Sequence, residues 1–313
     1  MSTERGRLDR DIRPENSGNG DPDEVGQKRG DPMVPHVVTP VDGSPESWRG
    51  AETAIALART VDASVTVLSI ADSDGERAER LDQIARDLSL LDTSGVEVEV
   101  DVRTTGASIA AAIEEVVELF PGAAVVMASH GRGRSSALVG SVAEDVLRRT
   151  FGPLLVVGPN VRGVDFSGPV IVTVDGSAES ERAVPLAVAL SIELGVAPWI
   201  MEVASQRSTP PPGGVESVYV ARLAHEAQRA SGHEVEFEEV HGQQPAVAIA
   251  DEALRRGASM IVSCSHGRTG LRRLALGSVS AGFVRHAPCP VLLVREPHPA
   301  EPVHAAHGHG ETH

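Results

Sequence analysis

Short apolar runs alternate with longer amphipathic segments between residues 36 and 294, and the whole alternation occurs twice. The short runs are nearly continuous in valine and isoleucine, which is typical of parallel strands covered by helices on both faces. The first copy predicts strands at 36–41, 64–70, 96–102, 123–128 and 154–157, and helices at 45–60, 76–91, 108–120 and 141–149. The second predicts strands at 170–174, 199–203, 234–240, 260–263 and 291–294, and helices at 179–194, 216–230, 245–256 and 278–286. Five strands alternating with four helices in each copy indicate two doubly wound α/β domains.

Four short motifs recur at a domain-sized distance along the chain. Residues 40–44 (PVDGS) recur at 173–177 (TVDGS), 129–132 (SHGR) at 265–268, 140–142 (GSV) at 277–279, and 153–157 (PLLVV) at 290–294 (PVLLV). The offsets of 133, 136, 137 and 137 residues indicate a duplicated domain rather than a short solenoid repeat. The segment that joins the copies, about 158–168, is short, so we expect the two domains to pack together.

The two ends of the chain differ from the middle. Residues 1–33 are polar, charged and rich in glycine and proline, so they cannot bury enough apolar surface to offset the entropy of ordering. Residues 296–313 are similar and hold five of the twelve histidines, which predicts a flexible tail, with a metal-binding tail as the alternative. The expected organisation is a disordered head at 1–33, domains at 34–158 and 169–295, and the tail.

Composition narrows the classes of function. A formal net charge of −16 argues against a nucleic-acid binder, which needs a surplus of cations. Two cysteines, no apolar run long enough to span a membrane and a charged start predict a cytoplasmic protein without a signal peptide. Lys28 is the only lysine among 28 basic residues, which argues against a Walker-type phosphate loop or a Schiff base.

The residues with candidate chemistry fall at the carboxyl ends of the predicted strands, where open α/β sheets bind ligands. Asp42 and Asp175 follow the first strand of each copy, and a Ser-His-Gly loop follows the fourth. Gly140-Ser141 and Gly277-Ser278 then open a helix, where unpaired amides and the helix dipole favour an anion. A Gly-Ser pair is also an ordinary helix start, but its occurrence in both copies favours ligand binding.

Other candidates have two interpretations. Asp42 and Asp175 can accept hydrogen bonds from a ribose or adenine, or hold the turn between strand and helix. His130 and His266 lack a Ser-His-Asp spacing and the first glycine of a nucleophile elbow, so we expect a loop-closing role. Cys264 corresponds to Ala128 in the first copy, so we expect a small buried side chain rather than a nucleophile.

Each copy resembles the universal stress protein domain, and the chain from 36 to 295 resembles a tandem two-domain member. The ATP-binding branch of that family carries G-x-x-G, nine residues, then G-S or G-T. The second copy reads Cys264-Ser-His-Gly267, nine residues, then Gly277-Ser278, so only the leading glycine differs. The first copy reads Ala128-Ser-His-Gly131, eight residues, then Gly140-Ser141, so it lacks that glycine and one loop residue.

The resemblance implies a flavodoxin-like, adenine nucleotide alpha hydrolase-like sheet with strand order 3-2-1-4-5. It implies ATP, with or without Mg²⁺, with adenine near the first-strand aspartate and the phosphates in the glycine loop. It implies pseudo-dimeric packing of the two domains and a homodimer of the whole chain. It assigns binding to Pro40, Val41, Asp42, Ala128, Gly131, Gly140, Ser141 and Val142 in the first copy, and to Val174, Asp175, Cys264, Gly267, Gly277, Ser278 and Val279 in the second.

The leading hypothesis is therefore a stress-response protein that binds an adenine nucleotide and alters its contacts with a protein partner. We expect the second copy to bind better, because its loop spacing is intact. The alternative is a stress protein of the branch that does not bind nucleotide and acts as a dimeric interaction module, which the altered leading glycines favour. Dedicated catalysis is not expected, since neither His-x-Gly-His nor Ser-Gly-Gly-x-Asp occurs at a suitable strand end; weak ATP hydrolysis stays open.

Overall fold

The structure is a computed structural model of the whole chain. It describes residues 32–131, 139–149, 152–204, 218–265 and 276–295. The expected tail, nearly all of the expected head and the predicted binding residue Gly267 lie outside these ranges. All of the described residues belong to one compact unit.

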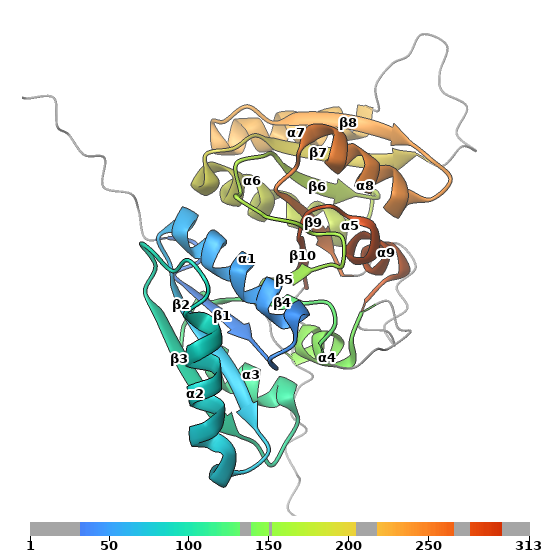
Figure 1. Cartoon of the computed structure of the whole chain (residues 1–313). Coiled ribbons are helices and arrows are strands. Elements are labelled where there is room, and N and C mark those ends of the chain that lie inside the picture. The colour runs from blue at the N-terminus through green and yellow to red at the C-terminus, as the bar shows by residue number, and fades with distance from the viewer. Residues whose placement is uncertain (1–31, 132–138, 150–151, 205–217, 266–275, 296–313) are drawn as a thin grey trace, which may run out of the picture. The chain divides into compact units, whose positions relative to one another are not determined.

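The first half of the described chain alternates strands with helices as its apolar pattern predicts (Figure 1). Its strands are β1 (His36–Pro40), β2 (Ser64–Ala71), β3 (Val98–Thr104), β4 (Ala124–Ala128) and β5 (Leu154–Val157), and its helices are α1 (Pro45–Val61), α2 (Arg77–Leu88), α3 (Ile109–Val117) and α4 (Ser141–Arg149), with a 3-10 turn, η1 (Asp74–Glu76), before α2. The start of α1 is fixed locally, because the Ser44 hydroxyl accepts a hydrogen bond from the Ser47 amide and Pro45 occupies the first turn.

The second half repeats this arrangement. Its strands are β6 (Val170–Val174), β7 (Pro198–Ala204), β8 (Glu236–His241), β9 (Met260–Cys264) and β10 (Val291–Val294), and its helices are α5 (Ala178–Glu181), α6 (Ala183–Leu194), α7 (Val218–Ser231), α8 (Pro245–Arg256) and α9 (Ser278–His286). Helices α6 and α8 end at Gly195 and Gly257, which take the left-handed conformation that terminates a helix.

The described strands form one ten-stranded sheet in the order β3-β2-β1-β4-β5-β10-β9-β6-β7-β8. Every pairing within each half is parallel. Each half therefore has the strand order 3-2-1-4-5, which confirms the doubly wound flavodoxin-like fold implied by the resemblance.

The two halves join through β5 and β10, which pair antiparallel with Leu155 opposite Leu292. Because each of these strands has the other as its neighbour, neither leaves an open edge. The outer strands of the sheet are β3 and β8, and both carry several charged residues among the apolar ones. Charged side chains on an outer strand disfavour pairing with a further strand. The strands through which the two domains pair, β5 and β10, therefore belong to the same chain.

Two apolar layers cover the sheet, one on each face. Buried side chains of α1, α2, α6 and α7 belong to one layer, and those of α3, α4, α8 and α9 belong to the other. The alternation of side chains along a strand produces this division, since Val37 of β1 joins the first layer and Val38 the second. Each layer contains residues from both halves, so the halves share their core.

The joining segment between β5 and β6 is held against the core by a few buried residues, while most of its other residues are exposed. Val161 and Phe166 are 3% and 1% exposed, and both belong to the first apolar layer. Gly158 lies so close to α9 that an added Cβ would overlap the carbonyl of Val284. These contacts attach the segment to the core on both faces of the sheet. Together with the β5–β10 pair they hold the two domains against each other, as the short segment predicts.

Several predicted elements differ in their bounds from the structure, and two of these differences have a clear local cause. The helix expected at 179–194 is split into α5 and α6 at Arg182, because Pro185 lacks the amide that would bond to the carbonyl of Glu181. The strand expected at 96–102 runs from Val98 to Thr104, because a turn closed by the Val96 amide on the Thr93 carbonyl delays its start.

Candidate functional site

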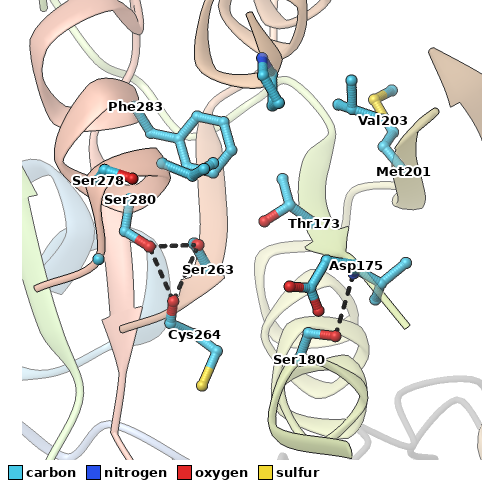
Figure 2. Close-up of a pocket in the computed structure, with 14 residues that line it drawn as sticks. Thr173, Asp175, Ser180, Met201, Val203, Ser263, Cys264, Ser278, Ser280 and Phe283 are labelled. Atoms are coloured by element: carbon cyan, nitrogen blue, oxygen red, sulfur yellow. Dashed lines mark hydrogen bonds between the residues drawn. The ribbon is translucent and has the colours of Figure 1, made fainter. Parts of the chain in front are cut away.

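Each half contains a cavity at the carboxyl ends of its first and fourth strands, where the strand order reverses. The cavity of the second half, called here the second pocket, has a volume of about 230 Å³ and lies between β6, β7 and β9 and the starts of α8 and α9 (Figure 2). The equivalent first pocket has a volume of about 140 Å³ and is formed by β1, β2 and β4 with α3 and α4.

The second pocket opens because its two central strands separate. Strands β6 and β9 are paired from Val170 to Val172 and from Met260 to Val262, and the pairing stops there. The next residues, Thr173 and Ser263, lie on opposite sides of the gap and line the pocket (Figure 2). This is the crevice in which doubly wound sheets bind ligands.

The turn after the first strand is built in the same way in both halves. Asp175 Oδ1 accepts hydrogen bonds from the Ser177 amide at 3.0 Å and the Ser177 hydroxyl at 2.6 Å. Gly176 has a φ of 81°, a backbone conformation that favours glycine, and Ser177 caps α5. Asp42 and Ser44 repeat these contacts at 2.9 and 2.6 Å in the first half.

These contacts address the two interpretations of the aspartates. One carboxylate oxygen of each holds the turn between strand and helix, as one interpretation expects. Asp175 and Asp42 also line their pockets, and Figure 2 shows the Asp175 carboxyl group pointing into the gap between β6 and β9. The turn therefore fixes a carboxylate at the mouth of each pocket.

Helix α9 begins at the opposite wall of the second pocket. Gly277 is its N-cap residue and provides no side-chain hydrogen bond to the first turn. The Gly277 amide bonds to the Ser265 carbonyl at 2.8 Å, and Gly140 makes the same bond to Ser129 in the first half. The positive end of α9 therefore faces the mouth of the pocket without a serine or aspartate cap, an arrangement suited to an anion.

The loop after β4 approaches the first aspartate very closely. A Cβ added to Gly131 would overlap the Asp42 carboxylate, so a larger residue here would require that side chain to shift. The next residues of this loop, and all but the first residues of its counterpart after β9, lie outside the described ranges. His130 lines the first pocket, and its Nδ1 lies 3.1 Å from the Ser129 hydroxyl.

The floors of the two pockets have different chemistry. In the second pocket Thr173, Ser263 and Ser280 contribute hydroxyl groups. At the equivalent positions the first half has Pro40, Met127 and Ala143. Met127 is 7% exposed and packs in the apolar core, so its side chain occupies space that the smaller serine leaves open. This difference contributes to the smaller volume of the first pocket.

Most of the predicted site residues lie together. The second pocket is lined by Val174, Asp175, Cys264, Gly277, Ser278 and Val279, and the first by Pro40, Val41, Asp42, Ala128, Gly131 and Val142. Gly140 and Ser141 open α4 but do not line the first pocket. Cys264 is buried, as expected, and is also a lining residue.

Sequence reasoning did not assign binding to the remaining lining residues of either pocket, although it considered His130 and expected a loop-closing role for it. These are Thr173, Ser180, Met201, Val203, Pro245, Ser263, Ser280 and Phe283 in the second pocket, and Ser47, Leu68, Ile70, Ile109, Met127 and His130 in the first. A position-by-position comparison of the two copies would have identified part of the second set, because it places hydroxyls at buried strand and helix positions where the other copy has apolar side chains.

The electrostatics around the second pocket include Tyr219 of α7. Burial and, to a smaller extent, the nearby Glu181 carboxylate raise the pKa of Tyr219 to about 12. The phenol therefore stays protonated at neutral pH beside the Asp-Gly-Ser turn. Among the described residues, no group of three or more His, Cys, Asp or Glu side chains could hold a metal ion.

Within the described residues, none of the helices has both the length and the apolar character required to cross a membrane. Comparisons with known proteins agree with the duplicated domain described above. The sequence profile described as the universal stress protein family matches residues 33–158 and again 167–295. A universal stress protein of Mycolicibacterium smegmatis is 29% identical over 241 residues, which cover 74% of this chain and 80% of the relative. A universal stress protein of Mycobacterium tuberculosis is 30% identical over 183 residues, which cover 55% of this chain and 61% of the relative.

Solved structures share the fold. A universal stress protein from Archaeoglobus fulgidus has a TM-score of 0.64 at 21% identity, covering 85% of this chain and 98% of that chain. A protein from Pseudomonas aeruginosa described as a putative universal stress protein has a TM-score of 0.55 at 15% identity, covering 84% and 93%. At these identities the likeness establishes the two-domain architecture alone.

Proposed function

Since the chain belongs to the universal stress protein family and carries the family's domain twice, we propose that it is a stress-response protein that binds ATP or a related adenine nucleotide. The binding site is the second pocket. Occupancy of this pocket alters the surface around its mouth and thereby the contacts with a protein partner. Both cysteines are buried and neither forms a disulfide, which favours action in a reducing compartment such as the cytoplasm.

The second pocket supports this proposal because it combines three kinds of surface around one cavity. Met201, Val203 and Phe283 provide apolar walls suited to the faces of a planar ring. Asp175 provides a carboxylate that can accept hydrogen bonds from ribose hydroxyls. The start of α9 provides backbone amides and the positive end of a helix dipole for phosphate groups. This juxtaposition is the single observation that carries the proposal.

The same residues favour binding over turnover. Among the described residues that line the second pocket there is no lysine, arginine or histidine to stabilise a phosphoryl group in transfer. Any Mg²⁺ would arrive with the nucleotide and be held by its phosphates, a common mode for this ion. The effect of the nucleotide is then a shift in population between loaded and empty forms.

The test uses the full-length protein. Small molecules released on denaturation are identified by mass spectrometry, and thermal unfolding is measured with and without ATP and Mg²⁺. A ligand present at 100 times its dissociation constant stabilises the folded form by about 2.7 kcal/mol, which is readily seen as a higher midpoint. A protein that carries no nucleotide and unfolds at the same temperature with and without ATP contradicts the proposal.

A second candidate function is supported by the first pocket. Met127 fills its floor and Asp42 lies against Gly131, which favours a domain that contacts other proteins without a nucleotide. A Gly277→Val variant separates the candidates, because the added side chain would crowd the Ser265 carbonyl, which lies 3.2 Å from an ideal Cβ. Nucleotide binding predicts that this variant loses the thermal shift with ATP. A pure interaction module predicts no shift in either the wild type or the variant.

A further inference from the structure

The hydroxyl groups at the floor of the second pocket direct their protons into the protein. The Ser280 hydroxyl donates to the Cys264 carbonyl at 2.9 Å. The Ser263 hydroxyl lies 3.2 Å from the Ser280 oxygen and 3.3 Å from the same carbonyl. Figure 2 shows these three groups as a triangle on one wall of the pocket. A hydroxyl has one proton and two lone pairs, so what this pair of serines presents to the cavity is acceptor capacity.

Two further hydroxyls of the lining follow the same rule, whereas Ser278 lies at the exposed start of α9. Thr173 Oγ1 donates to the Val262 carbonyl at 3.4 Å, and Ser180 Oγ donates to the Ser177 carbonyl at 2.9 Å. Asp175 adds a carboxylate, which is an acceptor at neutral pH. Ser263 and Ser280 are 4% and 5% exposed, so a ligand atom beside them would be shielded from water. In such a place a mismatched polar group is costly, because water cannot replace the missing partner.

We propose that Ser263, oriented by Ser280, selects ligands whose ring presents a hydrogen-bond donor to the pocket floor. This inference rests on the proposed function and specifies it: the favoured nucleotides carry an amino group on the base, and those with a carbonyl at the same position are rejected. A carbonyl there would place an acceptor against the serine oxygens, with no proton between them. Ser263 is a specificity-determining residue in this account.

The first pocket lacks the selecting groups. Pro40 has no hydroxyl, and Met127 and Ala143 stand at the positions of Ser263 and Ser280. Discrimination between an amino group and a carbonyl is thus expected of the second half alone. The Asp-Gly-Ser turn cannot be its source, because both halves contain it.

The experiment measures the affinity of the full-length protein for ATP and for inosine triphosphate by isothermal titration calorimetry. These probes differ at one position of the purine ring, where ATP has an amino group and inosine triphosphate has a carbonyl, with the adjacent nitrogen protonated. We expect the wild type to bind ATP at least tenfold more tightly. In a Ser263→Ala/Ser280→Ala variant the ratio of the two affinities should fall at least fivefold. Folding is checked by the thermal midpoint without ligand.

A matched control removes an equally buried hydroxyl elsewhere. Ser191 is fully buried in α6 and donates to the Ala187 carbonyl at 2.7 Å, outside both pockets. Ser191→Ala should leave the affinity ratio unchanged. If the wild type binds neither nucleotide, the proposed function and this inference both fall. If ATP binds but the serine variant keeps the wild-type ratio, or the wild type binds both probes equally, this inference alone is overturned.

Discussion

Replacing Ser263 with methionine should make the floor of the second pocket more like that of the first. Met127 occupies the equivalent position, and the two cavities measure about 230 and 140 Å³, a difference of about 90 Å³. That difference equals roughly three water molecules at about 30 Å³ each. A purine could then no longer reach the floor. Methionine is unbranched and adapts to irregular space, so the domain should still fold.

The size of the effect follows from the buried base. A purine has about ten non-hydrogen atoms, and a ligand of this class gains about 0.3 kcal/mol per atom. Exclusion of the base should therefore cost about 3 kcal/mol, or roughly 100-fold in the dissociation constant for ATP. Ser263→Thr adds less volume and keeps the hydroxyl, so it should give an intermediate loss.

Calorimetric titration of the full-length variants with ATP measures this loss, and circular dichroism during heating monitors the fold. We expect the methionine variant without ligand to unfold within a few degrees of the wild type, since 1 kcal/mol corresponds to about 2–4 °C in proteins of comparable size. A folded methionine variant that binds ATP within threefold of the wild type would refute the assignment of the base to this floor.

Three other changes test different parts of the structure. Met127→Ser should cost about 2–5 kcal/mol of stability in a denaturant titration, as large-to-small core changes do, and should raise the number of ATP molecules bound per chain. Gly158→Ala should destabilise the chain by about 1–3 kcal/mol in the same assay, because its Cβ would overlap the carbonyl of Val284; an unchanged midpoint would contradict the close packing. Burial lowers the pKa of His36, so the unfolded chain takes up a proton first and stability falls as the pH drops through about 6.5 toward the folded value. His36→Gln cannot titrate, so thermal midpoints between pH 7.5 and 5.5 should decline less steeply than in the wild type.

The His36 prediction depends on its surroundings as well as on burial. Its ring stacks on Phe120 with centroids 3.6 Å apart, and its two nitrogens lie 2.7 Å from Ser64 Oγ and 2.9 Å from Thr66 Oγ1. Glu97 and Glu99 oppose the shift by raising the pKa. Glutamine retains donor and acceptor atoms for the two hydroxyls, which makes it the suitable non-titrating control.

The sequence was sufficient for the architecture because the signals for the fold are local. Valine-rich runs mark strands covered on both faces, and the offset motifs mark the duplication. The turn at Asp175 was also readable, since an Asp-Gly-Ser sequence combines a side-chain acceptor, a glycine with positive φ and a helix cap. The break between α5 and α6 also has a local cause, Pro185. The apolar periodicity continues on both sides of it and therefore predicts one unbroken helix.

The pocket floor could not be predicted in the same way. Ser263 belongs to an apolar strand, and its exposure to a cavity depends on where β6 and β9 stop pairing and on how α9 packs above them. Whether Ser280 hydrogen-bonds to β9 depends on the rotation of α9, which tertiary contacts determine. Such features result from the arrangement of three elements that are distant in sequence, so no local pattern encodes them.

The antiparallel join between β5 and β10 also determines where the two pockets face. All strands of the first half run in one direction and all strands of the second half run in the other, so the carboxyl ends of the two halves emerge at opposite borders of the continuous sheet. The mouths of the two pockets therefore lie at opposite borders of the sheet. We expect a partner docked at one mouth to leave the other mouth open to a second partner.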